Sequence, residues 1–165
     1  MRPDGVDELI RRYRLTASEV DQALAAINPD QLRHYPGEGD WSPLQIIHHL
    51  ADAEVIAGGR LRLILSRDRA PIVAYDEKQL QEAAAPFRRS TAGSVALFRA
   101  HIETTAELLD ALSADAWRRK GEHEEAGEYS IETWLRGRID HAHLHVEQIR
   151  TVRLGPPEVS DREGA

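Results

Sequence analysis

Histidines are the residues of this chain whose type and spacing most directly indicate chemistry. Five of the eight lie in two short clusters, which are His48 and His49, and His141, His143 and His145. Side chains four residues apart lie one above the other on an α-helix, so His141 and His145 can point at one ion. His143 lies roughly 160–200° around the helix from them and is expected on the outside. Neutral imidazole is the commonest protein ligand for divalent transition metals, which makes the pair a candidate metal site.

A third ligand has to come from another helix. The H-x-x-x-H spacing alone does not prove a metal site. It is equally consistent with two partly buried histidines that hydrogen bond to their neighbours. Helical bundles build metal sites from inward side chains on facing helices, and the earlier cluster offers His48 or His49. Apolar residues flank both positions, so periodicity leaves the choice between them open.

The acids near these clusters have an ordinary structural interpretation as solvated helix charges. They are Asp52, Glu54, Asp140 and Glu147. Asp52 or Glu54 has a second interpretation, as a partner that fixes the orientation of a ligand histidine.

Three further histidines and two tryptophans complete the set of candidates. His123 lies in a polar segment and is within reach of the mouth of a bundle, but an exposed loop histidine is the favoured interpretation. His34 and His101 are expected to be incidental. Trp41 and Trp134 lie near the starts of the two histidine-bearing helices, where we expect packing, with a pocket wall as the alternative.

Composition excludes several classes of site. The chain has no cysteine, which excludes disulfides, cysteine nucleophiles and iron–sulfur clusters, so any thiol has to come from a small molecule. The net charge is -7 and the basic residues are scattered, which argues against a nucleic-acid partner. No apolar run has membrane-spanning length, and the first residues do not resemble a signal peptide, so we expect no membrane partner and a cytoplasmic protein.

Hydrophobic periodicity predicts an all-α protein in one domain, residues 1–154. Four long amphipathic helices are expected, at 5–27, 42–66, 90–112 and 130–154. Ser42, Pro43 and Gln45 form a capping box with proline at the first helical position, which predicts a sharp start for the second helix. The connections 28–41, 67–89 and 113–129 are expected to be loops apart from a short turn near 29–33, with no strand. Residues 155–165 are expected to be a disordered polar tail.

Three segments carry a resemblance to the DinB-like (YfiT-like) superfamily. The stretch from Trp41 to Glu54, WSPLQIIHHLADAE, resembles a family signature of W-S followed by H-L-x-D-x-E. The stretch from Asp140 to Ile149, DHAHLHVEQI, is similar to the closing H-x-x-x-H-x-x-Q-I, and the stretch from Gly121 to Ser130, GEHEEAGEYS, resembles G-x-H-x-x-x-G. The order and spacing of the three motifs make the combination fairly specific.

The resemblance implies a four-helix bundle with up-down-down-up topology, in which 67–89 is the long crossover between helices two and three. It implies a divalent metal, Zn or Ni, held by His49, His141 and His145, and therefore favours His49 over His48. It also implies a homodimer and a small-molecule substrate. Activities in the family include transfer reactions that use mycothiol, bacillithiol or glutathione, so we expect a metal-dependent transferase that uses an external thiol. The alternatives are a metal-dependent hydrolase and a non-enzymatic stress-response binding module, and no catalytic residue is assigned.

Overall fold

A computed structural model of the chain describes residues 3–37 and 39–154, so the predicted tail 155–165 lies outside the described residues. The elements are, in order, α1 (Val6–Ala25), η1 (Gln31–Arg33), α2 (Pro43–Ser66), β1 (Ala70–Ile72), α3 (Glu77–Ala83), η2 (Pro86–Arg88), α4 (Thr91–Asp110), α5 (Ala114–Trp117), β2 (Lys120–His123), β3 (Gly127–Ser130) and α6 (Ile131–Leu154). The four long helices α1, α2, α4 and α6 correspond to the four that the sequence predicts.

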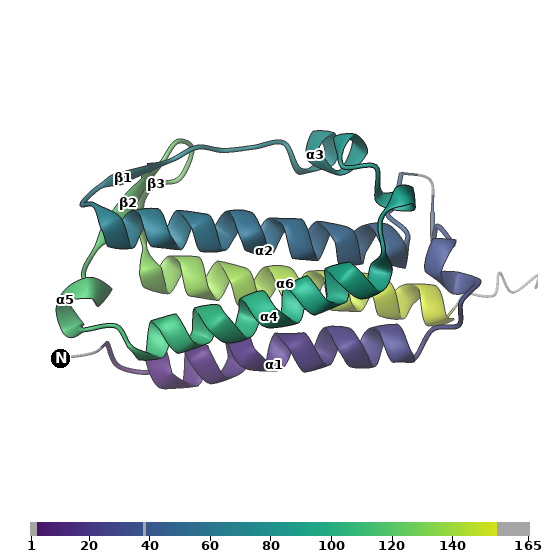
Figure 1. The fold of residues 1–165 in the computed structure, drawn as a ribbon, viewed down its shortest axis with the longest axis horizontal. Coiled ribbons are helices and arrows are strands. Elements are labelled where there is room, and N and C mark those ends of the chain that lie inside the picture. Colours follow the sequence, from purple (N-terminus) through teal and green to yellow (C-terminus); the bar gives the residue numbers. More distant parts are fainter. Residues whose placement is uncertain (1–2, 38, 155–165) are drawn as a thin grey trace, which may run out of the picture.

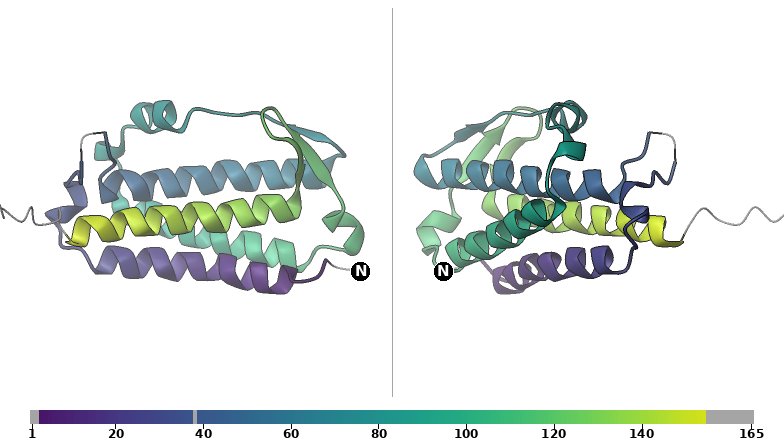
Figure 2. Two further views of the ribbon diagram at one scale, coloured as in Figure 1. Left: turned by 180° about the vertical axis from the view of Figure 1, so that it is seen from behind. Right: turned by 45° about the vertical axis from the view of Figure 1, so that its right-hand side comes forward.

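These four helices form a bundle in which each contacts two neighbours. α1 packs against α4 and α6, and α2 packs against the same two helices on the other side. Figures 1 and 2 show the four helices lying side by side, with α1 and α6 running in one direction and α2 and α4 in the other. The apolar stripe of each helix faces the common core, where Tyr13, Phe98 and Trp134 are almost fully buried. Among the described residues, no helix has the length and apolarity needed to cross a membrane.

The capping signals in the sequence set the helix starts. The Ser42 hydroxyl accepts a hydrogen bond from the backbone N–H of Gln45, and the Gln45 side chain accepts one from the backbone N–H of Ser42. Both halves of the predicted capping box are therefore formed, and α2 begins at Pro43. The Ser90 hydroxyl likewise accepts from the backbone N–H of Gly93 at the start of α4.

The two long connections are not the plain loops that the sequence predicted, and the expectation of no strand was wrong. β1 pairs in parallel with β2, and β2 pairs antiparallel with β3, so a small sheet joins 67–89 to 113–129 at one end of the bundle (Figure 1). Strands of three or four residues are too short to display a period of two, and β2 and β3 carry charged residues and glycine rather than β-branched ones. Gly121 permits this pairing, because a Cβ there would lie 2.6 Å from Ile72 Cδ1.

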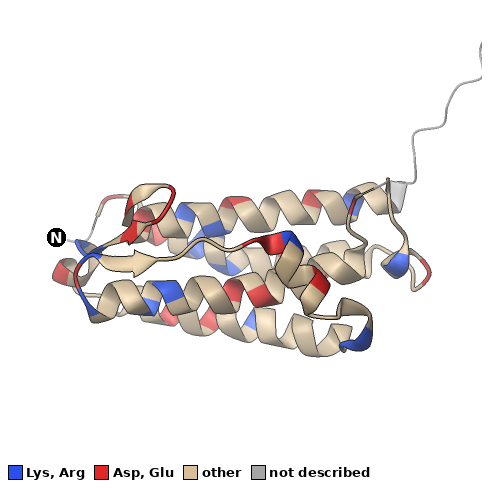
Figure 3. Cartoon of the chain, turned by 90° about the horizontal axis from the view of Figure 1, so that it is seen from above, with Lys and Arg blue, Asp and Glu red and all other residues tan. Residues whose placement is uncertain are grey.

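The crossover between α2 and α4 passes along the outside of α2 and is fixed to it by polar contacts. The buried Gln81 side chain, in α3, donates to the backbone carbonyl of Gln45 at 2.6 Å. Arg89, directly after η2, donates to both carboxylate oxygens of Asp52 at 2.5 and 2.7 Å. On the face that carries the crossover, acidic and basic residues are interspersed and no continuous basic stripe is visible (Figure 3).

Candidate metal centre

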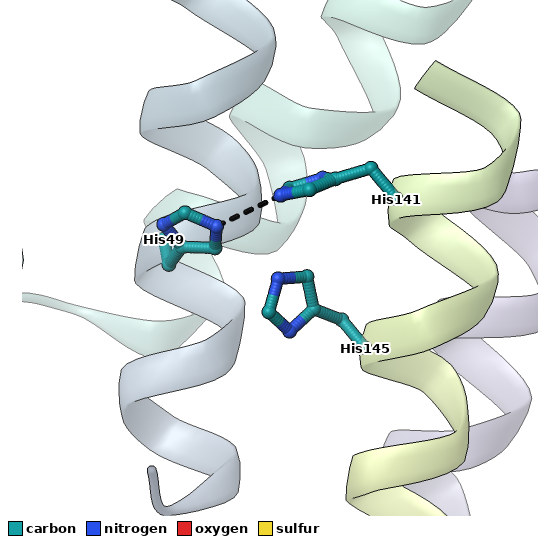
Figure 4. Close-up of side chains that lie close together, drawn as sticks. All are labelled: His49, His141 and His145. Carbon is teal, nitrogen blue, oxygen red and sulfur yellow. Dashed lines mark hydrogen bonds between the residues drawn. The ribbon is translucent and has the colours of Figure 1, made fainter. Parts of the chain in front are cut away.

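Three histidine side chains from two helices converge between α2 and α6. His49 lies on α2, and His141 and His145 lie one turn apart on α6 (Figure 4). One ring nitrogen from each lies within 4.8 Å of the others, and the Nε2 atoms of His49 and His141 are 3.0 Å apart. Two nitrogens bound to one ion at about 2.1 Å can be at most about 4.2 Å apart. A small rotation of the rings would therefore bring all three to an ion.

Behind His141 lies a buried chain of charged and polar side chains. Arg138, one turn earlier on α6, donates from one terminal nitrogen to His141 Nδ1 at 2.9 Å and from Nε to a carboxylate oxygen of Glu54 at 2.7 Å. The hydroxyl of Tyr13 donates to the other Glu54 oxygen at 2.7 Å. Arginine only donates, so Nδ1 of His141 accepts and the proton of this neutral ring lies on Nε2, facing His49. A neutral ring binds an ion through Nε2 only with its proton on Nδ1, so metal binding here would require the other tautomer and the loss of the hydrogen bond from Arg138.

His145 is oriented from its own helix. Its Nδ1 lies 2.7 Å from Oε1 of Gln148, one turn further along α6. The amide oxygen can only accept, so Nδ1 carries the proton and Nε2 keeps its lone pair for an ion. This is the usual arrangement around a metal-binding histidine, in which the nitrogen away from the ion donates to a fixed acceptor.

The electrostatic environment keeps all three rings neutral. Burial is the main cause in each case, and it lowers the pKa of His49 to about 3 and that of His141 to about 2. The Arg138 cation lowers the pKa of His141 further, and the neighbouring His145 does the same for His49. The pKa of His145 is also lowered by burial, against the opposing effect of its hydrogen bond to Gln148. Neutral imidazole is the form that binds a metal, so these residues fit a divalent ion.

In front of the triad lies a cavity of about 290 Å³ that opens to solvent. Trp41 forms one wall, and its ring stacks on His145 with centroids 6.1 Å apart. Of the two roles expected for Trp41, core packing or lining a pocket, the structure therefore shows the second. Asp40 and Glu77 line the same cavity, as does the exposed Leu144. Oε2 of Glu77 lies 3.7 Å from Nε2 of His49.

The other candidate histidines lie away from this centre. His48 is buried against α4, where its Nδ1 lies 2.7 Å from the Ser94 hydroxyl. His143 points away from the triad, as expected, but it is half-buried against α1 rather than on the outside, with Nε2 3.0 Å from a carboxylate oxygen of Glu19. His123 ends β2, and its Nδ1 accepts from the backbone N–H of Glu125. His34 is exposed, and His101 packs against Gly58 on α2.

Asp52 and Glu54, the two acids of the H-L-x-D-x-E motif, do not contact a ligand histidine directly. Asp52 binds Arg89 of the crossover, and Glu54 is completely buried against Tyr13 and Arg138. The expectation that Glu54 is a solvated charge was therefore wrong, and its link to His141 passes through Arg138. Arg138, Tyr13 and Glu77 were not among the residues that the sequence predicted for the site. Only the position of Arg138, one turn before His141, offered a signal.

The sequence model of the DinB superfamily matches residues 12–149. The chain belongs to the DinB superfamily. Among curated members, it is 27% identical over 144 residues to "Putative metal-dependent hydrolase YfiT" of Bacillus subtilis, covering 87% of this chain and 81% of that protein. It is 33% identical over 126 residues to "Putative metal-dependent hydrolase OB0782" of Oceanobacillus iheyensis, covering 76% and 73%.

Two solved structures resemble the fold. YfiT from Bacillus subtilis, described as a probable metal-dependent hydrolase with an unusual four-helix bundle topology, superposes with a TM-score of 0.83 at 25% identity, over 92% of this chain and 87% of that one. A mycothiol-dependent maleylpyruvate isomerase superposes with a TM-score of 0.71 at 16% identity, over 87% and 60%. The second likeness is one of fold alone.

Proposed function

We propose that this protein is a metal-dependent enzyme that acts on a small molecule, with the ion held by His49, His141 and His145. The observation that carries the proposal is the convergence of three neutral imidazoles, two of which, His141 and His145, line an open cavity. Three protein ligands leave coordination positions for water or substrate, which is the pattern of catalytic rather than structural sites. Zn and Ni are the ions we expect, because both accept imidazole ligands.

Hydrolysis is the reaction that we place first, because the relatives described above carry the name of metal-dependent hydrolases. When bound, the ion would supply Lewis acidity and a lowered pKa for a coordinated water or thiol. The chain itself orients His145 through Gln148, and Trp41 and Leu144 offer apolar contacts to a substrate in the cavity.

Elemental analysis tests the metal site. We expect about one equivalent of metal per chain in protein expressed without an affinity tag, and its loss in His49→Ala and His141→Ala. His143→Ala is the matched control, because it removes an imidazole from the same helix that faces α1 instead of the triad. Equal metal content in all four proteins would overturn the site.

A thiol-dependent transferase is the second candidate. The chain has no cysteine, so a thiolate bound to the ion would have to come from a low-molecular-weight thiol, and the open cavity gives it access. Turnover of ester and amide substrates by the metal-loaded protein, without added thiol, would support hydrolysis. Turnover of an electrophilic substrate only in the presence of mycothiol, bacillithiol or glutathione would support transfer.

The family resemblance also implies a helix topology, an oligomeric state and a cellular location, which we include in the proposal. We propose an up-down-down-up bundle with 67–89 as its crossover, supported by the helix directions in Figure 1. We also propose that the protein is a homodimer in the cytoplasm. Light scattering on the purified protein tests the dimer, and a molar mass of one chain would reject it.

A further inference from the structure

Glu77 is the acidic side chain nearest to a ligand nitrogen of the triad among the ion pairs of the described residues. Its Oε2 lies 3.7 Å from Nε2 of His49, and it lines the same cavity as His141 and His145. Among the described residues its carboxylate has no other hydrogen-bond or ion-pair partner. About half of the side chain is exposed, so it can rotate without disturbing the packing of the bundle.

The crossover holds the backbone of Glu77 in place over the triad. Glu77 is the first residue of α3, which Asp76 caps by accepting from the backbone N–H of Gln79 at 2.9 Å. The Gln81 side chain, on the same helix, bonds the carbonyl of Gln45. Gln45 lies one helical turn before His49 on α2, so this contact sets the position of α3 along α2 next to the ligand.

On this basis, and resting on the proposed metal site, we propose that Glu77 is a fourth ligand, a carboxylate that the crossover adds to the ion held by the three histidines. Two ligand atoms on one ion lie at most about 4.2 Å apart, and 3.7 Å already falls within that limit for Glu77 and His49. The half-exposed side chain is free to rotate toward such an ion. A set of three nitrogens and one oxygen suits Zn, Ni or Fe.

Charge balance supports the same assignment. Three neutral imidazoles leave both positive charges of a divalent ion uncompensated, and the Arg138 cation lies directly behind His141. Glu54 is already bound to Arg138 and Tyr13, so it cannot also compensate the ion. A carboxylate from the front supplies the missing negative charge, and because it sits on an exposed side chain, a substrate can displace it.

The test compares metal affinity and cobalt absorption spectra in three variants. We expect Glu77→Gln to weaken Zn binding at least about tenfold in a competition titration with a chromophoric chelator, and to change the visible spectrum of the Co(II)-loaded protein. Glu82→Gln removes the same charge from an exposed position on the same helix and should change neither property. Asp40→Asn, in the same cavity, should behave like Glu82→Gln if the oxygen ligand comes from α3 alone.

The outcomes separate this inference from the metal site itself. Loss of metal in His141→Ala, together with Glu77→Gln that matches Glu82→Gln in affinity and spectrum, would overturn the role of Glu77 and keep the triad. A wild-type protein that binds neither Zn nor Co(II) would overturn both. Thermal unfolding of each variant, followed by circular dichroism with a chelator present, should be unchanged, so that a shift in affinity reports the ligand and not the fold.

Discussion

Behind His141, the side chains of Arg138 and Glu54 are 13% and 0% exposed and hydrogen bond to each other and to their neighbours at 2.7–2.9 Å. In front of His141, Asp40 and Glu77 lie on exposed segments and line a cavity that opens to solvent. The same metal centre therefore has a rear built from the bundle core and a front built from the connections.

The contrast follows from the cost of burying charge. A buried ion pair gives little net stability, yet removing one partner is expensive because the other charge stays uncompensated. The rear therefore stabilises the fold beside His141 only when both Arg138 and Glu54 are present. An exposed carboxylate such as Glu77 has no such constraint, so the front can change without affecting the fold. We expect changes at the rear to alter stability first, and changes at the front to alter ligand binding first.

The largest expected effect is at the rear, in Glu54→Gln. The substitution keeps the shape but removes the charge, and leaves Arg138 as a buried cation without a counter-ion. We expect the free energy of unfolding to fall by about 3–5 kcal/mol, measured by urea denaturation and circular dichroism.

Two further variants make that prediction specific. Glu132→Gln breaks the exposed pair with Arg136 on α6 and should cost less than about 0.5 kcal/mol. The double substitution Glu54→Leu and Arg138→Met removes both charges together and should recover most of the lost stability. If Glu54→Gln and Glu132→Gln were equally mild, the rear of the site would not differ from an ordinary surface pair.

The contrast between rear and front also explains what the sequence could and could not predict. The four long helices were predicted because their caps and apolar stripes are local signals, as at Ser42 and Gln45. The pair His141 and His145 followed from helical spacing. The choice of His49 came from its place in the family motif, because burial does not distinguish it from His48, and both are buried.

The rear network and the strands carry no local signal. Arg138 and Glu54 are 84 positions apart, and each looks like an ordinary helix charge in its own segment. The pairing of β1 with β2 depends on contact between two connections rather than on a strand pattern in either. Glu77 is likewise one acid among several in the crossover until the hydrogen bond from Gln81 to Gln45 places it beside His49.

The second prediction concerns a ligand that is oriented from the solvent-facing side. Gln148→Leu removes the acceptor that fixes His145, while Gln148 itself is exposed. We expect metal affinity to fall about 10–100-fold, with little change in the free energy of unfolding. Glu147→Leu, an adjacent exposed position paired with Arg150, is the control and should leave affinity unchanged. A loss of stability in Gln148→Leu equal to that in Glu54→Gln would contradict the division into rear and front.

The third prediction uses the lowered pKa values of the triad. Below about pH 6.5 the unfolded chain takes up protons on these histidines, whereas the folded chain does not until about pH 3 for His49 and about pH 2 for His141. Stability is therefore present above pH 6.5 and is lost as the pH falls below it. Each such histidine contributes about 1.4 kcal/mol per pH unit to the slope.

Urea denaturation with a chelator, at pH 6 and pH 5, measures that slope. His141→Ala should show a slope smaller than wild type by about one proton, or about 1.4 kcal/mol per pH unit. His49→Ala, which removes the other histidine whose pKa is strongly lowered, should show a similar reduction. Equal slopes in all three proteins would mean that His141 takes up its proton in the folded state as easily as in the unfolded one.

The last prediction concerns the crossover, where Asp52→Asn is expected to have a small effect on stability. It weakens the two hydrogen bonds through which Arg89 holds the end of the crossover, in a pair that is 22–29% exposed. We expect a loss of about 1 kcal/mol or less in the free energy of unfolding, and faster tryptic cleavage within 67–90. Because the crossover carries Glu77, the same variant should also weaken metal binding. The losses of Asp52→Asn and Glu77→Gln should not add in the double variant, since both remove one contribution. Additive losses in affinity would show that Asp52 acts on the ion by a route independent of Glu77.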